Sequence, residues 1–135
     1  MKFVLDTSAA VKCFAREDGS EEAIGLLASG ATFVVPDIFP LEVASALLRK
    51  ERRGDVTLGT AHRALVELDL IEFELVPHAS MLAAATALAS RHRHGAYDCL
   101  FLMIARDRAL PVATFDGPMA GLARQLGIEL WNPAA

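Results

Sequence analysis

The chain has 135 residues, of which 53% are hydrophobic and 22% charged, and its formal net charge is −4. This length and composition predict one globular domain, residues 1–135, and exclude a chain of two domains. The acidic balance leaves a nucleic-acid partner open, because four of the 17 acids, once bound to cations, would leave no more acids than the 13 bases.

The hydrophobic pattern predicts strands and helices that alternate along the whole chain. In chain order we expect a strand at 3–5, a helix at 9–15, a helix at 21–29, a strand at 32–35, a helix at 39–53, a helix at 57–70, a strand at 71–76, a helix at 79–93, a helix at 97–110, a strand at 112–114, a helix at 118–126 and a strand at 128–131. Such alternation is typical of an α/β fold with a mainly parallel sheet between helices, a three-layer sandwich.

Two of the predicted helices carry details that a structure can test. In the helix at 39–53 we place Leu41, Ala44 and Leu48 on the core side. For the helix at 57–70, Thr57 is the expected N-cap.

The apolar stretches are too short for a membrane protein. Only residues 3–5 follow Met1-Lys2 before Asp6, which does not make a signal peptide. No stretch approaches the ~20 residues that span a bilayer. We therefore expect a cytoplasmic protein with no membrane partner. The high apolar content also indicates that a second subunit or another partner covers part of the surface.

Two cysteines, Cys13 and Cys99, lie in apolar helical patterns and have neither metal-ligand nor redox spacing. We interpret both as buried small apolar residues in a reducing compartment.

Four acids are predicted to converge at one edge of the sheet. Asp6 follows the first strand and Asp116 follows the strand at 112–114, while Glu42 and Asp98 fall in the first turns of their helices. In an open α/β sheet, ligands bind beyond the carboxyl ends of the strands, near the point where the strand order reverses. We therefore expect all four carboxylates to face that point.

Clustered carboxylates favour a hard divalent cation. Mg²⁺ and Mn²⁺ prefer carboxylate and water oxygens, and one or two such ions can promote water attack on a phosphodiester. Without a cation the four acids repel one another, which makes an empty site costly.

Each acid also has an ordinary structural explanation. Asp6 and Asp116 can cap the helices that follow them, the latter ahead of Gly117-Pro118. Asp98 can stabilise a helix N-terminus through the helix dipole, and Glu42 can belong to a solvated face.

The four segments together resemble the PIN-domain family, and in particular VapC-type toxins. The resemblance rests on Phe3-Val4-Leu5-Asp6-Thr7-Ser8, Pro40-Leu41-Glu42-Val43, Tyr97-Asp98-Cys99-Leu100 and Thr114-Phe115-Asp116, and it covers essentially the whole chain. Phe115 and Gly117-Pro118 depart from the family's more polar pattern, which concerns the loop at Asp116.

This resemblance implies a five-stranded parallel sheet and a Mg²⁺- or Mn²⁺-dependent endoribonuclease, the toxin of a toxin–antitoxin pair. Asp6, Glu42, Asp98 and Asp116 would hold the metal. Thr7, Ser8 and Thr114 would assist. The implied partners are an RNA substrate, a small antitoxin and a second copy of the chain.

Basic residues flank the predicted site. The segment Arg91-His92-Arg93-His94 precedes Asp98, and Arg91, Arg93 and His94 are candidate RNA contacts. The alternatives are a solvated helix end or a zinc site made by His92 and His94, for which no other ligand has suitable spacing. Residues Lys50, Arg52 and Arg53 form a second basic group whose ordinary explanation is also a solvated helix end.

Two other function classes remain open. One is another acid-pocket phosphoesterase or a receiver domain, but the second acid that these require close to Asp6 is missing. The other is a catalytically silent interaction module that keeps the fold and lacks the chemistry.

Overall fold

Four short apolar runs form the central sheet of the computed structural model, which describes residues 1–131. The strands are β1 (Lys2–Leu5), β2 (Thr32–Pro36), β3 (Phe73–Val76) and β4 (Val112–Ala113). They pair in the order β3-β2-β1-β4, and all three pairings are parallel. The chain moves from β1 outward to β3 and then returns to the other side of β1, so the strand order reverses between β1 and β4.

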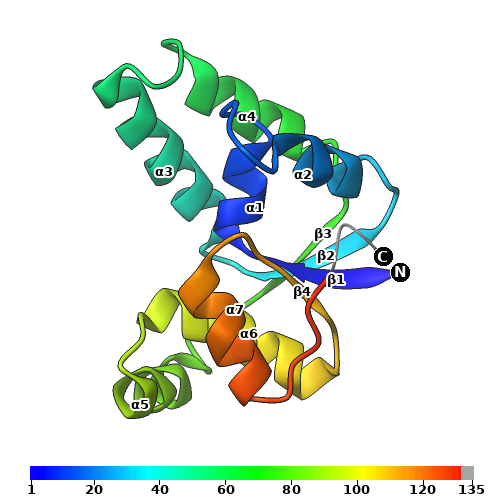
Figure 1. The fold of residues 1–135 in the computed structure, drawn as a ribbon, viewed down its shortest axis with the longest axis vertical. Coiled ribbons are helices and arrows are strands. Elements are labelled where there is room, and N and C mark those ends of the chain that lie inside the picture. Colours follow the sequence, from blue (N-terminus) through cyan, green and yellow to red (C-terminus); the bar gives the residue numbers. More distant parts are fainter. Residues whose placement is uncertain (132–135) are drawn as a thin grey trace.

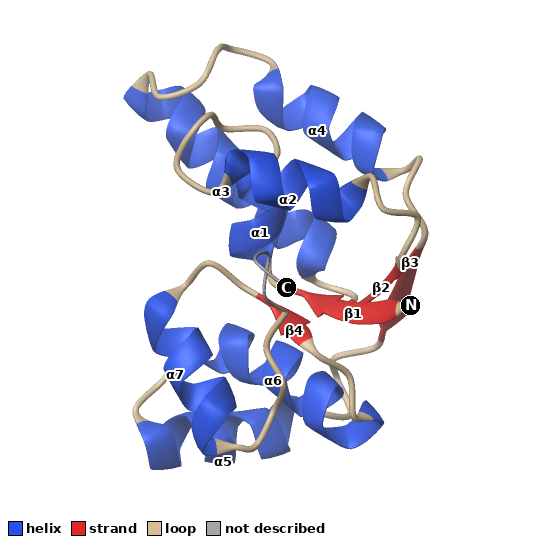
Figure 2. Ribbon diagram, turned by 45° about the vertical axis from the view of Figure 1, so that its right-hand side comes forward, coloured by secondary structure: helices blue, strands red, loops and turns tan. Residues whose placement is uncertain are grey.

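Helices cover both faces of the sheet, as the sequence predicts (Figure 1 and Figure 2). The helices are α1 (Thr7–Lys12), α2 (Ser20–Leu27), α3 (Phe39–Arg53), α4 (Thr60–Leu68), α5 (Leu82–His92), α6 (Ala96–Arg108) and α7 (Gly117–Gln125). In both views α1 to α4 lie on one side of the sheet and α5 to α7 on the other. The α/β three-layer prediction is thus confirmed.

Helix α6 is the centre of the lower layer. Every residue from Cys99 to Ala105 is buried, which is the pattern of a helix surrounded by protein on all sides. Phe101 meets Phe39 edge to face, with ring centroids 6.3 Å apart. Because α6 is packed so tightly, the position of its first turn, which carries Asp98, is fixed by the core.

The sheet has four strands where the resemblance implies five. The segment 128–131 does reach β4, but only as a single bridge between Val112 and Leu130. The Val112 N–H donates to the Glu129 carbonyl and the Trp131 N–H to the Val112 carbonyl, each at 2.9 Å. Since β4 is only two residues long, it offers no further backbone groups for a longer ladder.

The core side of α3 differs from the predicted one. Its buried residues are Phe39, Val43 and Leu47, whereas Leu41 and Leu48 are 69% and 44% exposed. The Phe39 ring packs on Phe101 and also on Phe73, at 5.2 Å between centroids, and so sets the rotation of the helix. This rotation leaves Glu42 half-buried rather than on a fully solvated face.

The prediction that both cysteines are buried holds for one of them. Cys99 is buried, but Cys13 is only partly so, because α1 ends at Lys12 and the sulfur lies at the helix end. Burial still raises the pKa of the Cys13 thiol to about 11, so it stays protonated at neutral pH. No helix within residues 1–131 is both long and apolar enough to cross a membrane.

The N-terminus of α4 is capped by a side chain from α3 rather than by Thr57. The helix starts at Thr60, and the Glu51 carboxylate accepts the N–H groups of Gly59 and Ala61, each at 3.0 Å. These bonds hold the pKa of Glu51 below its ordinary value. Glu51 therefore joins the two helices through donors that would otherwise be unsatisfied.

We predict that Glu51→Gln lowers the melting temperature at neutral pH. A carboxyl whose folded-state pKa is lowered contributes stability above its unfolded-state pKa and loses it as the pH falls through the folded-state value. The difference between wild type and variant should therefore shrink in acid. Thermal melts across pH test this, with Glu67→Gln, an exposed glutamate of α4, as control. A constant difference at every pH would contradict the capping role.

Candidate functional site

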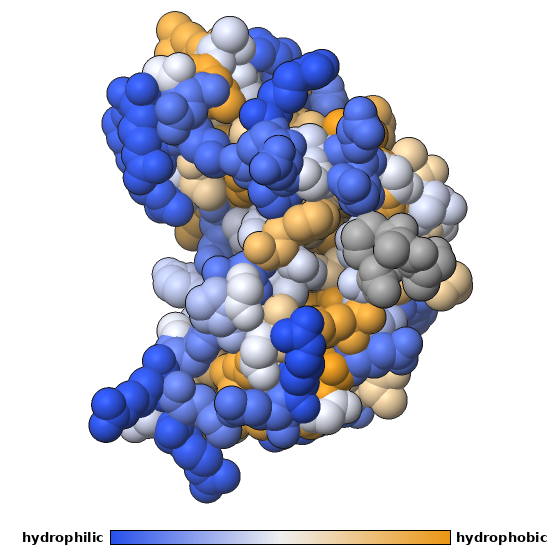
Figure 3. All heavy atoms as spheres, viewed as in Figure 1, coloured by the Kyte–Doolittle hydropathy of each residue, from blue (hydrophilic) through white to orange (hydrophobic). Residues whose placement is uncertain are grey.

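The four predicted acids all lie where strands or connecting loops open onto one edge of the sheet. Asp6 directly follows β1 and is the N-cap of α1, and Asp116, three residues after the end of β4, is the N-cap of α7. Glu42 and Asp98 occupy the first turns of α3 and α6. In Figure 3, drawn in the view of Figure 1, the surface is indented on the side toward which β1 runs, between the two helical layers.

Asp6 is the most buried of the four, at 4% exposed. Its Oδ2 accepts two hydrogen bonds, from Ser8 Oγ at 2.6 Å and from Thr114 Oγ1 at 2.8 Å. Burial raises the pKa of Asp6 and the Asp98 carboxylate raises it further, while the two hydroxyls lower it. The pKa of Asp6 is raised overall, so the ionised carboxylate is less stable here than it is in water.

The same two hydroxyls also fix the loop that carries Asp116. Ser8 Oγ accepts the Phe115 N–H and Thr114 Oγ1 accepts the Asp116 N–H, both at 3.0 Å. Each hydroxyl thus donates to Asp6 and accepts from the loop after β4. The positions of Asp6 and Asp116 are therefore coupled through Ser8 and Thr114.

Glu42 reaches the same edge from α3. Thr7 Oγ1 donates to its Oε1 at 3.3 Å. Burial raises the pKa of Glu42 from 4.5 to about 7, and the carboxylates of Asp6 and Asp98 add to the rise. The opposing influences, the Thr7 hydrogen bond and the charge of Arg49, are smaller than the combined rise.

Asp98 meets a histidine. His94 Nε2 lies 2.8 Å from Asp98 Oδ2, and the imidazole is largely buried. Burial raises the pKa of Asp98 and the Asp116 charge adds to it, whereas His94 lowers it. Ligand atoms of His94, Asp98 and Asp116 lie within 4.8 Å of one another, a spacing that one cation can bridge.

Asp116 also caps α7, as its alternative structural role predicts, and it uses one carboxylate oxygen to do so. Its Oδ2 accepts the Met119 N–H at 3.0 Å. The second oxygen remains for another ligand, since a carboxylate can accept on both oxygens. Capping and cation binding are therefore compatible here.

The candidate RNA contacts separate into two groups. Arg91 and Arg93 are exposed at the end of α5, where Arg93 is the C-cap in a left-handed conformation. His94 instead turns inward to Asp98. Within residues 1–131, the possible metal cluster contains His94 and not His92, which disfavours a zinc site built by this pair. The sequence pattern gave His94 as an RNA contact or, with His92, as a zinc ligand, and it did not identify the bond from His94 to Asp98.

Comparison with known proteins identifies the family of the chain. A family model described as the PIN domain matches residues 3–125. The chain belongs to the PIN-domain family. Ribonuclease VapC3 of Pyrobaculum aerophilum is 30% identical to this PIN-domain protein over 122 residues, which are 89% of this chain and 93% of the relative.

A solved structure shows the same fold. The crystal structure of PAE2754 from Pyrobaculum aerophilum matches this PIN domain with a TM-score of 0.64 and 19% identity, over 94% of this chain and 98% of that one. At this identity the likeness supports the arrangement of elements. The site itself must be argued from its own residues.

The donor set of this PIN domain fits a hard divalent cation. The four acids offer oxygen ligands, and the ion pairs formed by the described residues include no lysine or arginine on any of them. Burial raises the pKa of Asp6, Glu42 and Asp98, and repulsion from neighbouring acids adds to the rise. A bound cation would remove this penalty.

We predict that the metal-free protein loses stability as the pH rises, and that Glu42→Gln reduces this loss. The folded-state pKa of Glu42, about 7, lies above its ordinary value of 4.5. Between these values the folded protein keeps a proton that the unfolded chain has released, so the free energy of unfolding falls as the pH rises through this window. Urea unfolding in EDTA at several pH values measures the effect.

The control for this prediction is Glu22→Gln, which changes an exposed first-turn glutamate of α2. It should follow the wild-type pH dependence. If Glu42→Gln loses as much stability as wild type through the same window, Glu42 does not carry the buried charge that the geometry indicates.

Proposed function

We propose that this protein is a Mg²⁺- or Mn²⁺-dependent endoribonuclease, with Asp6, Glu42, Asp98 and Asp116 as the metal ligands. The observation that carries the proposal is that the four acids follow strands or begin helices at the edge where the strand order reverses. Three of them have raised pKa values, and Asp98 and Asp116 lie with His94 at a spacing that suits a cation. Membership of the PIN-domain family and the likeness to a protein named as a ribonuclease support it.

The chain's own residues orient the site. When bound, a divalent cation supplies a Lewis acid that neutralises phosphate charge and favours deprotonation of an attacking water. Ser8 and Thr114 hold one Asp6 oxygen, which leaves the other free to face the cation. The Thr7 hydroxyl holds Glu42 in the same way. These fixed hydroxyls reduce the reorganisation that binding requires.

His94 acts as a positioning residue in this proposal. Its Nε2 contacts one oxygen of Asp98, so the other oxygen can turn toward Asp116. Hydrogen bonds of this kind to a ligating carboxylate fix its orientation and tune metal affinity.

The partners proposed are an RNA substrate, a small antitoxin and a second copy of the chain, with the protein acting as a cytoplasmic toxin. Support comes from the likeness to VapC3 and from large apolar side chains left exposed. The most exposed of these beyond Met1 are Leu58, Leu70 and Leu41. Such groups offer apolar contact area to a protein partner.

The first test of the proposal is cleavage of a structured RNA by the purified protein. Wild type should cut in Mn²⁺ or Mg²⁺ and not in EDTA. Asp98→Asn should lose at least about a hundredfold in rate, because it removes a ligand charge at almost unchanged size. Asp107→Asn, an exposed aspartate on the same helix, is the matched control and should cut as wild type does.

The alternatives give different results. If the folded protein neither binds metal nor cleaves RNA, the result would support a silent interaction module. Hydrolysis of small phosphoesters without RNA cleavage would favour another acid-pocket phosphoesterase. Cleavage that survives EDTA or Asp98→Asn would contradict the proposed site.

The role of His94 is tested separately by metal affinity. We predict that His94→Ala weakens Mn²⁺ binding by roughly 10- to 100-fold, while His94→Gln, which keeps a hydrogen-bond donor, retains part of the affinity. Calorimetric titration of the apo protein measures both. Equal affinity of wild type and His94→Ala would show that Asp98 is oriented without His94.

A further inference from the structure

Two lysines from different helices share one carboxylate beside the acidic edge. Lys12 Nζ, at the end of α1, lies 3.3 Å from Glu17 Oε1, and Lys50 Nζ, on α3, lies 3.5 Å from Glu17 Oε2. The lysine side chains are only 17% and 23% exposed, whereas Glu17 is 37% exposed. The ammonium groups are thus held by the fold, with the carboxylate on their outer side.

This lysine pair adjoins the loop that carries Asp116. Lys12 Nζ lies 5.4 Å from the centroid of the Phe115 ring, which is within cation–π range. Phe115 precedes Asp116, and its N–H is fixed by Ser8. On the other side Arg49, the neighbour of Lys50 on α3, acts electrostatically on Glu42. Cationic groups therefore border the acids from α1 and α3.

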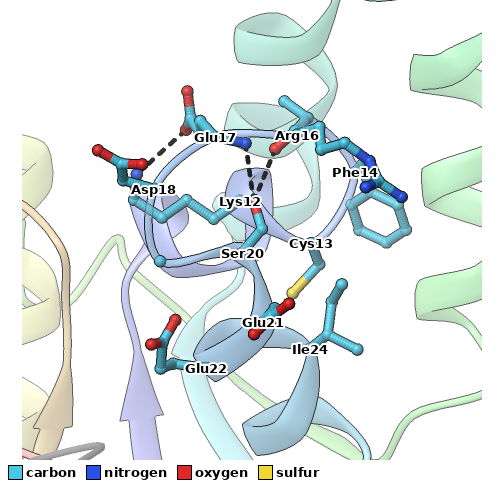
Figure 4. Close-up of a pocket in the computed structure, with 12 residues that line it drawn as sticks. Lys12, Cys13, Phe14, Arg16, Glu17, Asp18, Ser20, Glu21, Glu22 and Ile24 are labelled. Atoms are coloured by element: carbon cyan, nitrogen blue, oxygen red, sulfur yellow. Dashed lines mark hydrogen bonds and ion pairs between the residues drawn. The ribbon is translucent and has the colours of Figure 1, made fainter.

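The loop between α1 and α2 holds Glu17 in position. Ser20 Oγ accepts the Glu17 N–H at 3.0 Å and donates to the Ala15 carbonyl at 3.1 Å, as Figure 4 shows. Gly19 has a φ of +91°, and a Cβ there would lie 2.7 Å from the Phe115 ring. The loop therefore packs closely against Phe115. Its backbone holds Glu17 in place beside the two lysines.

An acidic edge alone repels a polyanion. An RNA strand that reaches four carboxylates needs cations next to them, since phosphate contacts fix the register of the strand. The two ammonium groups and the one carboxylate between them carry one excess positive charge as a triad. Arg16 lines the same hollow, as do the acids Asp18, Glu21 and Glu22. A phosphodiester carries the same charge as the Glu17 carboxylate and presents oxygens at similar spacing, so it can take that place.

We propose that Lys12 and Lys50 form a subsite for an RNA phosphate next to the acidic edge, and that Glu17 occupies this subsite in the free protein. The inference rests on the proposed ribonuclease function and names a part of its substrate site. Lys12 and Lys50 bind substrate here. Glu17 competes with it.

The test uses two kinds of variant that should change RNA affinity in opposite directions. Binding of a short fluorescein-labelled single-stranded RNA is measured by anisotropy in the Asp98→Asn background with Mg²⁺. Lys12→Gln/Lys50→Gln should bind roughly tenfold more weakly, the loss expected for charge-assisted contacts. Its slope of log affinity against log salt should fall by about 0.7 for each lost phosphate contact. Glu17→Gln should bind more tightly than the parent.

Matched variants separate binding from folding. Arg124→Gln removes an exposed positive charge at the far end of α7 and should leave affinity unchanged. Lys12→Arg/Lys50→Arg should restore binding. In the background with an intact site, the double Gln variant should raise KM with kcat little changed.

The outcomes distinguish this inference from the proposed function. If wild type cleaves RNA but the lysine variants bind and cut as the parent does, or if Glu17→Gln weakens binding, the subsite is wrong and the ribonuclease proposal stands. If wild type neither binds nor cleaves RNA, both are overturned.

Discussion

The structure depends most on how it keeps four like charges together at the edge of a parallel sheet. Asp6 is buried at the end of the central strand β1, and no arginine or lysine pairs with it among the described residues. Two hydroxyls hold it instead, and they also hold the loop after β4. Such an arrangement costs stability without a cation, and the metal site proposed above would relieve that cost.

The fold supplies the framework that this edge requires. Parallel strands end at the same side of the sheet, and the reversal of strand order between β1 and β4 leaves room for a ligand there. Helix α6 is buried from Cys99 to Ala105, which anchors the turn before it and keeps Asp98 at this edge. The packing of Phe39 against Phe101 and Phe73 rotates α3 so that Glu42 points to the same place.

Sequence patterns predicted the features that depend on local order and failed where distant contacts decide. The positions of Asp6 and Asp116 could be predicted, because parallel strands end at the same edge of the sheet. The rotation of α3 could not be predicted, because Leu41 and Leu48 fit an apolar stripe as well as Val43 and Leu47 do. His94 was missed as a partner of Asp98, since His94 precedes the N-cap Gly95 and lies outside α6, so helical periodicity does not pair the two residues. The single bridge from Leu130 to β4 and the Glu51 cap likewise depend on segments that meet only in the folded chain.

The central claim is that these carboxylates form one divalent-cation site, and its most direct test is the position of a bound ion. Crystals grown with Mn²⁺ give an anomalous signal that locates the ion without reference to activity. The account predicts a peak with oxygen ligands from Asp6, Asp98 and Asp116, and with Glu42 on the same ion or a neighbouring one. Full occupancy of Mn²⁺ elsewhere, with the four carboxylates unliganded, would contradict it.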